Sequence, residues 1–204
     1  SVPRVDSPPQ IDASLDDAAW RAATKLTGFH LYPAWKPARV QTTAWVCRDE
    51  TWLYVAFRCD EPNPGGIRRV VSQRDGSLSS DDSVEVFIDP GTSAGLYIHL
   101  QLNAGNVQAD QLVRDGRKHR TWNLPWRSAA KPDAHIDSST GWSAELAIPL
   151  SLVQALDGGG AWRMNLCRSR AAAPPIEYSS LGALGLGHGF HDPEHFLPVE
   201  GRDQ

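Results

Sequence analysis

Apolar and polar side chains alternate over residues 83–89 and again over residues 97–103. A period of two places successive side chains on opposite faces of a strand, so the pattern predicts a β-hairpin that turns at residues 90–95. One face of this hairpin is apolar and must be covered by a second layer. The other face carries side chains that can hydrogen-bond a ligand: Glu85, His99, Gln101 and Asn103. We predict that this polar face is the working surface of the protein.

Further strand patterns follow along the chain, separated by Gly, Pro, Asn and Asp residues that favour turns. Helical patterns are confined to two short segments, residues 15–23 and 150–156. Many short strands and little helix predict an all-β protein, an antiparallel β-sandwich (jelly-roll-like) with one or two short helices. The other predicted strands are residues 40–47, 52–60, 67–73, 142–148 and 162–167.

Composition narrows the class of protein. Hydrophobic residues make up 41% of the 204 residues and charged residues 22%, as in ordinary globular proteins. A net charge of −4 argues against a nucleic-acid partner, which requires a basic surface. No apolar run approaches the ~20 residues that a membrane span needs. Because no linker or repeat divides the sequence, we predict a single domain over residues 1–204.

The chain has three cysteines and eight tryptophans. Cys47 and Cys59 lie too many residues apart on neighbouring predicted strands for a disulfide, so only Cys167 could pair with either, and buried free thiols are the preferred interpretation. Tryptophans in a β-protein serve either as core or as stacking platforms for sugar rings. Trp35 lies in a Pro-rich loop, which makes it a candidate for stacking.

Carboxylates and hydroxyls gather at the mouths of two predicted loops. They belong to Asp60, Asp81, Asp82 and Ser83. Calcium prefers such hard oxygen ligands, and the loops flank one end of a predicted sheet. We therefore predict a structural calcium ion held by Asp60, Asp81 and Ser83, with acidic surface turns as the alternative.

Two motifs match catalytic or metal-binding patterns that their surroundings do not support. Residues 91–95 read G-x-S-x-G, but a strand pattern follows where the nucleophile elbow needs a helix. His188, His191 and His195 could bind a transition metal, but Pro193 interrupts their spacing. A hairpin turn and a structural turn are therefore the preferred interpretations.

Two further sets of residues could in principle bind a cofactor or catalyse a reaction. Met164 could ligate a haem iron, but it shares its parity with Trp162 and Leu166, which favours core packing. Glu85 and Glu145 form the best pair of carboxylates for glycoside hydrolysis. We prefer a hydrogen-bonding role for both glutamates.

An ordered series of segments covers nearly the whole chain: IDASLDDAAW, DETWLYVAFRCDEP, DDSVEVFIDP, YIHLQLNAGNVQAD, GWSAELAIPLSL, WRMNLCRSR and FHDPEHF. This series resembles the family 9 carbohydrate-binding modules and their relatives in the wider DOMON-like superfamily. The resemblance implies a β-sandwich and bound calcium. In sugar-binding members it also implies a polar floor beneath two tryptophans that clamp sugar rings at a chain end.

The resemblance assigns roles to single positions. Glu85 occupies the position of the family's sugar-contacting glutamate, whereas Gln101 replaces an arginine and Cys167 replaces a glutamine. Ser79 and Phe190 stand at the positions of the two clamping tryptophans, so the resemblance leaves one aromatic residue in the clamp. Each sugar–aromatic stack contributes on the order of 1 kcal/mol, so this clamp is expected to bind weakly.

The alternation pattern and the family resemblance select the same polar face. Side chains from nearby loops are expected to add further ligand contacts to it. The predicted function is non-catalytic glycan binding in a secreted or periplasmic protein, beside or attached to a carbohydrate-active enzyme. The basic segment at residues 114–120 makes anionic as well as neutral glycans candidates. The alternatives are a haem- or other cofactor-binding electron-transfer domain and a purely structural sandwich. The predicted ligand-binding residues are Glu85, Gln101, His99, Phe190, Arg74 and Trp35.

Overall fold

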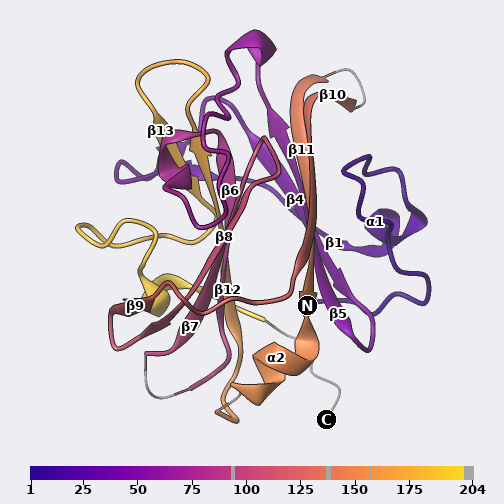
Figure 1. Ribbon diagram of the computed structural model, residues 1–204, viewed down its shortest axis with the longest axis vertical. Helices are drawn as coiled ribbons and strands as arrows, with labels where there is room; N and C mark the ends of the chain where they lie inside the picture. The colour runs from indigo at the N-terminus through magenta and orange to yellow at the C-terminus, as the bar shows by residue number, and fades with distance from the viewer. Residues whose placement is uncertain (93–94, 137–138, 157, 200–204) are drawn as a thin grey trace.

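Two β-sheets pack face to face in the computed structural model of the chain, which describes residues 1–92, 95–136, 139–156 and 158–199 (Figure 1). Within these ranges, a five-stranded sheet has the order β1 (Thr24–Leu26), β4 (Thr42–Arg48), β5 (Trp52–Asp60), β11 (Ser139–Pro149) and β10 (Arg127–Ile136). The nine-stranded sheet has the order β3 (Lys36–Pro37), β2 (His30–Leu31), β13 (Glu177–Ser180), β12 (Arg163–Arg170), β6 (Ser83–Asp89), β7 (Tyr97–Asn103), β8 (Gln108–Arg114) and β9 (Arg117–His119), with β14 (Leu197–Pro198) paired to β12.

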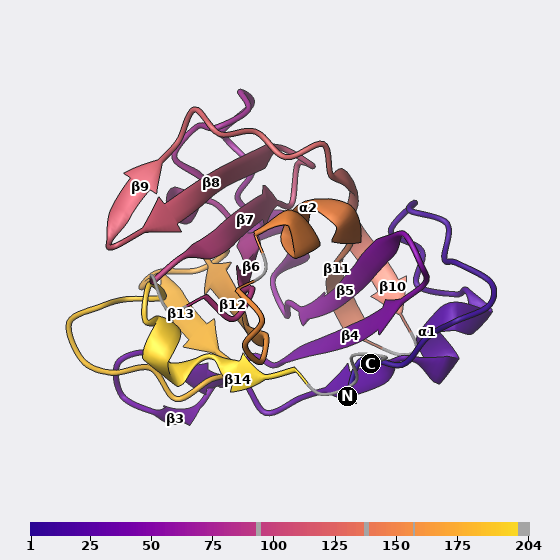
Figure 2. The same cartoon turned by 90° about the horizontal axis from the view of Figure 1, so that it is seen from below.

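Two short α-helices accompany the sheets. α1 (Ala18–Ala22) lies against the outer side of the five-stranded sheet, and α2 (Leu150–Ala155) lies over one end of the gap between the sheets (Figures 1 and 2). α2 inserts Leu150 and Val153 into the core. No helix among the described residues has the length and hydrophobicity needed to cross a membrane. The predicted all-β antiparallel sandwich with short helices is confirmed.

The predicted hairpin forms the centre of the larger sheet. β6 and β7 pair so that Val86 lies opposite Leu100 and Glu85 lies opposite Gln101. The apolar side chains of this register face the other sheet, where Phe57 and others complete a continuous core. Burying one such aliphatic side chain stabilises the fold by ~1.5–3 kcal/mol.

Two predicted elements differ from the structure. The strand expected over residues 67–73 does not form, because its backbone N–H groups find a buried carboxylate instead of a neighbouring strand. Asp81 accepts from the N–H groups of Val70 and Val71 at 3.0 and 2.9 Å. The helix expected over residues 15–23 is shorter, since Leu15 has a φ of 59°, which an α-helix cannot include.

All three cysteines are free and buried, as the preferred interpretation predicted. Burial raises the pKa of the Cys47 and Cys59 thiols to about 12 and places that of Cys167 well above its usual value. The thiolate is the reactive form, so these cysteines are inert in the folded protein.

We expect the native protein to react very slowly with Ellman's reagent and the unfolded protein to release three thiol equivalents at once. Absorbance in buffer and in guanidinium chloride measures both values. Rapid reaction of even one thiol in the native protein would contradict the burial described above.

Candidate functional site

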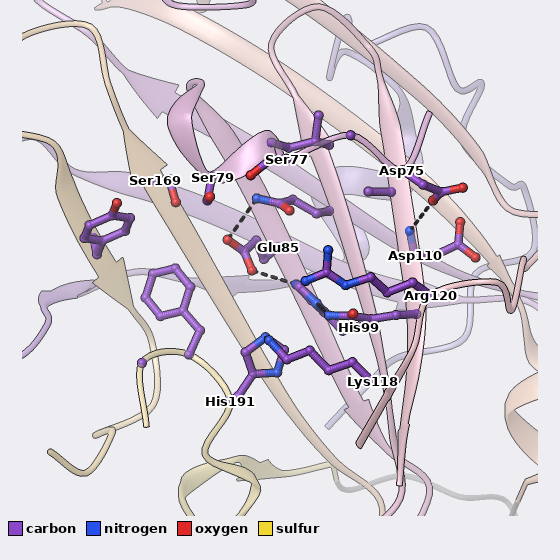
Figure 3. A pocket seen from close by; sticks show the side chains of 18 of the residues that line it. Asp75, Ser77, Ser79, Glu85, His99, Asp110, Lys118, Arg120, Ser169 and His191 are labelled. Atoms are coloured by element: carbon purple, nitrogen blue, oxygen red, sulfur yellow. Dashed lines mark hydrogen bonds and ion pairs between the residues drawn. The ribbon is translucent and has the colours of Figure 1, made fainter. Parts of the chain in front are cut away.

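A pocket with a volume of about 330 Å³ opens on the outer face of the larger sheet (Figure 3). Its floor consists of side chains from β6, β7 and β8. One wall is the loop that contains the 3₁₀ helix η2 (Leu78–Ser80), and a second wall comes from the segment after β13. β9 and the residue that follows it contribute a third side. Three segments far apart in the sequence thus enclose the polar face of the central hairpin.

The floor of the pocket is a hydrogen-bonded chain of four side chains. His99 Nε2 donates to Glu85 Oε2 at 2.6 Å, and Gln101 Nε2 donates to Glu85 Oε1 at 3.2 Å. Gln111 Nε2 donates to His99 Nδ1 at 2.7 Å. Since an amide N–H only donates, Nδ1 accepts from Gln111 and the Nε2 proton points to Glu85. The network fixes the Glu85 carboxylate in one orientation.

Packing beside the floor, on the same face of the sheet, holds His99 in place. Phe87 stacks on its ring with centroids 4.2 Å apart. Glu85, His99 and Gln101 are 5, 6 and 8% exposed, so each presents only a small area to the pocket. The predicted common face for Glu85 and Gln101 is confirmed by their pairing. Asn103 instead donates to the Val71 carbonyl and does not line the pocket in the described part of the chain.

The second wall of the pocket is aromatic and combines side chains from β13, from the segment after it and from the residue after β2. Phe190 and Tyr178 meet edge to face with centroids 6.0 Å apart, and Tyr32 lies beside them in the lining. Tyr32 Oη accepts the backbone N–H groups of Gly187 and Gly189 at 3.1 Å each, which fastens the loop that carries Phe190. Gly189 has a φ of 59°, a conformation that suits glycine.

The loop before β6 forms the opposite wall. Ser77, Leu78 and Ser79 line the pocket there, and Leu78 is buried. The loop approaches its own base closely, since a side chain at Gly76 would lie 2.6 Å from Val71 Cγ1. Ser79 thus presents a hydroxyl on the side facing the aromatic wall (Figure 3).

Arg74 and Trp35 are not among the described residues that line the pocket. The Arg74 guanidinium donates to Asn123 Oδ1 at 3.1 Å and pairs with Asp110, which fastens the loop to its neighbours. Trp35 stacks on His30 with centroids 4.3 Å apart and remains 43% exposed. Of the six predicted ligand-binding residues, the pocket brings together Glu85, Gln101, His99 and Phe190.

A neutral histidine of the segment after β13 contacts the third side of the pocket. Lys118 Nζ donates to His191 Nε2 at 3.0 Å, and Nδ1 lies 2.9 Å from Tyr97 Oη. Ammonium groups only donate, so Nε2 is unprotonated and the Nδ1 proton points to Tyr97. Burial, with the nearby positive charges of Lys118 and Arg120, lowers the pKa of His191 to about 3.

The predicted calcium ligands have separate partners. Both oxygens of Asp81 already accept backbone N–H groups, and Oδ2 also accepts Asn103 Nδ2 at 3.0 Å. The Ser83 hydroxyl accepts Gln101 Nε2 at 3.2 Å within the pocket floor. The described residues contain no group of three or more His, Cys, Asp or Glu side chains placed to share a metal ion.

Arginines neutralise the acidic residues of this region. Arg168 is buried, with 1% of its surface exposed, and donates to the Asp60 backbone carbonyl at 2.9 Å. Burial raises the pKa of Asp82, and the positive charge of Arg168 opposes this rise. Calcium stays a prediction: these arginines supply positive charge nearby, whereas the buried Oδ1 atoms of Asp60 and Asp82 have no hydrogen-bond partner among the described residues. The ion pairs are Arg58–Asp60 at 3.4 Å, Arg68–Asp81 at 3.7 Å, Arg168–Glu61 at 3.7 Å and Arg170–Glu61 at 2.7 Å.

The remaining motifs lie away from the pocket or have structural roles. Met164 packs in the core at 7% exposure, as predicted. Glu145 is buried beneath the N-terminal segment, where it accepts Trp20 Nε1 at 2.8 Å. His195 pairs with Asp192 at 2.8 Å. The rejected G-x-S-x-G motif includes residues 93 and 94, which lie outside the described residues.

Several pocket residues were not predicted. Gln111 continues the alternation into β8, a signal that extending the pattern past residue 110 would have found. Lys118 and Arg120 belong to the basic segment, whose position at the pocket depends on the β8–β9 hairpin. Nothing in the local sequence of Tyr178 marks it as a pocket residue.

Comparisons with known proteins agree with this architecture. The carbohydrate family 9 binding domain-like family matches residues 11–167. A candidate carbohydrate-binding protein from Bacteroides uniformis ATCC 8492 has a similar structure, with a TM-score of 0.74, 16% identity and coverage of 98% of this chain and 97% of that one. A family 9 carbohydrate-binding module from Caldicellulosiruptor kristjanssonii, in complex with cellotriose, has a TM-score of 0.64, 15% identity and coverage of 99% and 93%. No curated protein matches the sequence.

The predicted calcium ion implies that chelation of divalent ions lowers the thermal stability. An ion that binds only the native state stabilises it, so the melting temperature should be lower in EDTA than in millimolar calcium. Differential scanning calorimetry measures this. The same melting temperature in both buffers would count against the predicted ion.

We also expect His191 to destabilise the fold in acid. Its pKa is about 3 in the folded chain against an ordinary 6.5, so the unfolded state takes up a proton first as the pH falls. This histidine's contribution is complete above pH 6.5 and decreases below it, by up to about 1.4 kcal/mol per pH unit.

Urea unfolding between pH 7.5 and 4 compares the wild type with His191→Gln. The difference in their free energies of unfolding should be constant above pH 6.5 and should shift against the wild type below it. Parallel curves over the whole range would contradict a depressed pKa.

Proposed function

Because the chain belongs to the carbohydrate family 9 binding domain-like family, we propose that it binds a saccharide in the pocket on the outer face of the larger sheet. One observation carries the proposal. The pocket joins a fixed polar floor, centred on Glu85, to an aromatic wall that includes Phe190 and Tyr178. Sugars combine hydroxyl groups with apolar C–H faces, which matches such a pair of surfaces.

The floor provides acceptors for sugar hydroxyl groups. Each carboxylate oxygen of Glu85 already accepts one side-chain donor and retains a further acceptor position. Hydroxyl groups that donate to a carboxylate form charge-assisted hydrogen bonds, stronger than those between neutral groups. Because His99 and Gln101 hold the carboxylate in place, little of its freedom is lost on binding.

The size of the pocket limits the ligand. About 330 Å³ is at the lower end of the ~300–1,000 Å³ typical of small-molecule pockets. The site therefore suits one or two sugar rings and not a long stretch of polysaccharide. Phe190 is only 9% exposed, so stacking is limited and the expected affinity is weak.

Weak binding is useful when it is combined with another activity. We propose that the domain is non-catalytic and acts beside, or attached to, a carbohydrate-active enzyme, whose local concentration on its substrate it would raise. A polysaccharide too large to enter the cell is met outside the cytoplasm, so we propose a secreted or periplasmic location.

Support for the alternatives is weaker. Glu145 faces outward from the five-stranded sheet and Glu85 from the other one, so the core separates them. Stacked sheets lie ~10 Å apart and these side chains point away from each other, whereas glycosidase carboxylates lie within ~5–9.5 Å. Met164, the candidate haem ligand, is occupied in core packing.

Replacing Glu85 by glutamine tests the proposal. Glu85→Gln keeps the size of the side chain and removes its charge, so we expect at least about a tenfold loss of affinity for any saccharide that the wild type binds. Titration calorimetry and affinity gels with mono- and oligosaccharides measure it.

Glu50→Gln is the matched control, because it removes the same charge from the exposed turn between β4 and β5. Its affinity should equal that of the wild type. Unchanged binding by Glu85→Gln at an unchanged melting temperature would exclude the pocket floor as the binding site, and retention on no saccharide would refute the function itself.

A further inference from the structure

We infer that the pocket prefers acidic saccharides, whose carboxylate or sulfate group would contact Arg120 and Lys118 while their hydroxyl groups contact Glu85. This inference rests on the proposed function and adds the class of sugar. It follows from two basic side chains that reach the pocket without an ion-pair partner among the described residues, and from the contacts that its acidic side chains already make.

Arg120 is the first of these basic residues. It directly follows β9, is exposed, and lines the pocket. Figure 3 shows its side chain extending over the pocket from the same side as that of Lys118. Among the described residues, no hydrogen bond or ion pair engages its guanidinium. Its fork of N–H donors is therefore free to bind a carboxylate or sulfate in bidentate fashion.

Lys118 is the second. Its ammonium group donates to His191 Nε2 at 3.0 Å, which positions it at the pocket and leaves two N–H donors for a ligand. Partial burial and the charge of Arg120 lower the pKa of Lys118, and the charge of Glu85 opposes this in part. Two cations that repel each other in this way are stabilised by an anion placed between them.

Among the described residues, neither of these two cations forms an ion pair with an acidic side chain. The charge of Glu85 raises the pKa of Lys118, but the Glu85 carboxylate bonds to His99 and Gln101. Asp110 is paired with Arg74, on the far side of the floor from His191 (Figure 3). Asp75 accepts the Asp110 backbone N–H at 3.2 Å and lies 3.7 Å from the same arginine. A bound anion would thus give Lys118 and Arg120 the direct ion pair that neither makes within the described part of the chain.

The net charge of the chain acts in the opposite direction, and distance decides which effect is larger. A net charge of −4 repels anions at long range. At physiological ionic strength that field is largely screened beyond ~8 Å, whereas direct contacts at ~3 Å are screened much less. The preference should therefore appear in affinity, and further salt should reduce it without abolishing it.

The carboxylate of Glu85 restricts which anions fit. A free anion of the size of acetate would meet its negative charge without offering it a hydroxyl donor. A uronic acid or a sulfated sugar offers both groups on one ring. The combination of one acceptor floor and two unpaired cations therefore indicates an acidic sugar and not anions in general.

The test compares D-glucose, D-glucuronic acid, D-glucose 6-sulfate and acetate by NMR titration of the wild type. Either acidic sugar should bind about tenfold or more tightly than glucose, and acetate should bind more weakly than the acidic sugars. The two acidic sugars distinguish carboxylate from sulfate as the preferred group. Raising the salt from about 0.05 to about 0.5 M should reduce this advantage.

Arg120→Gln and Lys118→Gln should each reduce the affinity for the preferred acidic sugar about tenfold and leave the affinity for glucose within about twofold. Arg117→Gln is the matched control, since it removes a positive charge from the same hairpin outside the pocket lining. Its affinities should equal those of the wild type.

Three results would overturn the inference. Equal or tighter binding of glucose would refute it while leaving saccharide binding in place. An Arg117→Gln effect equal to that of Arg120→Gln would reduce the preference to nonspecific attraction. Failure of every sugar to bind would remove the proposed function and this inference together.

Discussion

The pairing of β6 with β7 is the constraint on which the pocket depends. Glu85 lies opposite Gln101 and Val86 opposite Leu100, so one register decides both the polar floor and the apolar core. A shift of one residue would turn every side chain to the other face and place the Glu85 charge among aliphatic groups. Burying an unpaired carboxylate costs several kcal/mol, so the core enforces the geometry of the floor.

The walls of the pocket depend on a different kind of interaction. Each wall is a loop fastened to the sheet by a few long-range hydrogen bonds. Tyr32 holds the loop before Phe190 through two backbone N–H groups, and Arg74 joins the loop before β6 to Asp110 on β8. These contacts require no ligand. The pocket is therefore shaped before binding, which reduces the entropy that a weakly bound sugar must overcome.

The sequence predicted the parts of this protein that follow from local periodicity. Alternation identified the hairpin, the core face of Val86 and the polar face of Glu85, because side chains in a strand have a period of two. It failed over residues 67–73, where two buried aspartates accept the backbone N–H groups that a neighbouring strand would have taken. Side-chain acceptors of this kind leave no periodic signal.

The position of the third side of the pocket could not be predicted from local periodicity either, because it depends on how distant segments meet. Lys118 and Arg120 were visible only as a basic segment, because their place beside His191 requires the β8–β9 hairpin and the loop after β13 to meet. The chain shares its fold with the Bacteroides uniformis protein at 16% identity and a TM-score of 0.74. A fold can be kept at such low identity because it depends on the pattern of core positions far more than on particular loop residues. Loops can therefore change the charge around a constant floor, and in this chain the side of the pocket that the sequence predicted least is the one where its ligand would be selected.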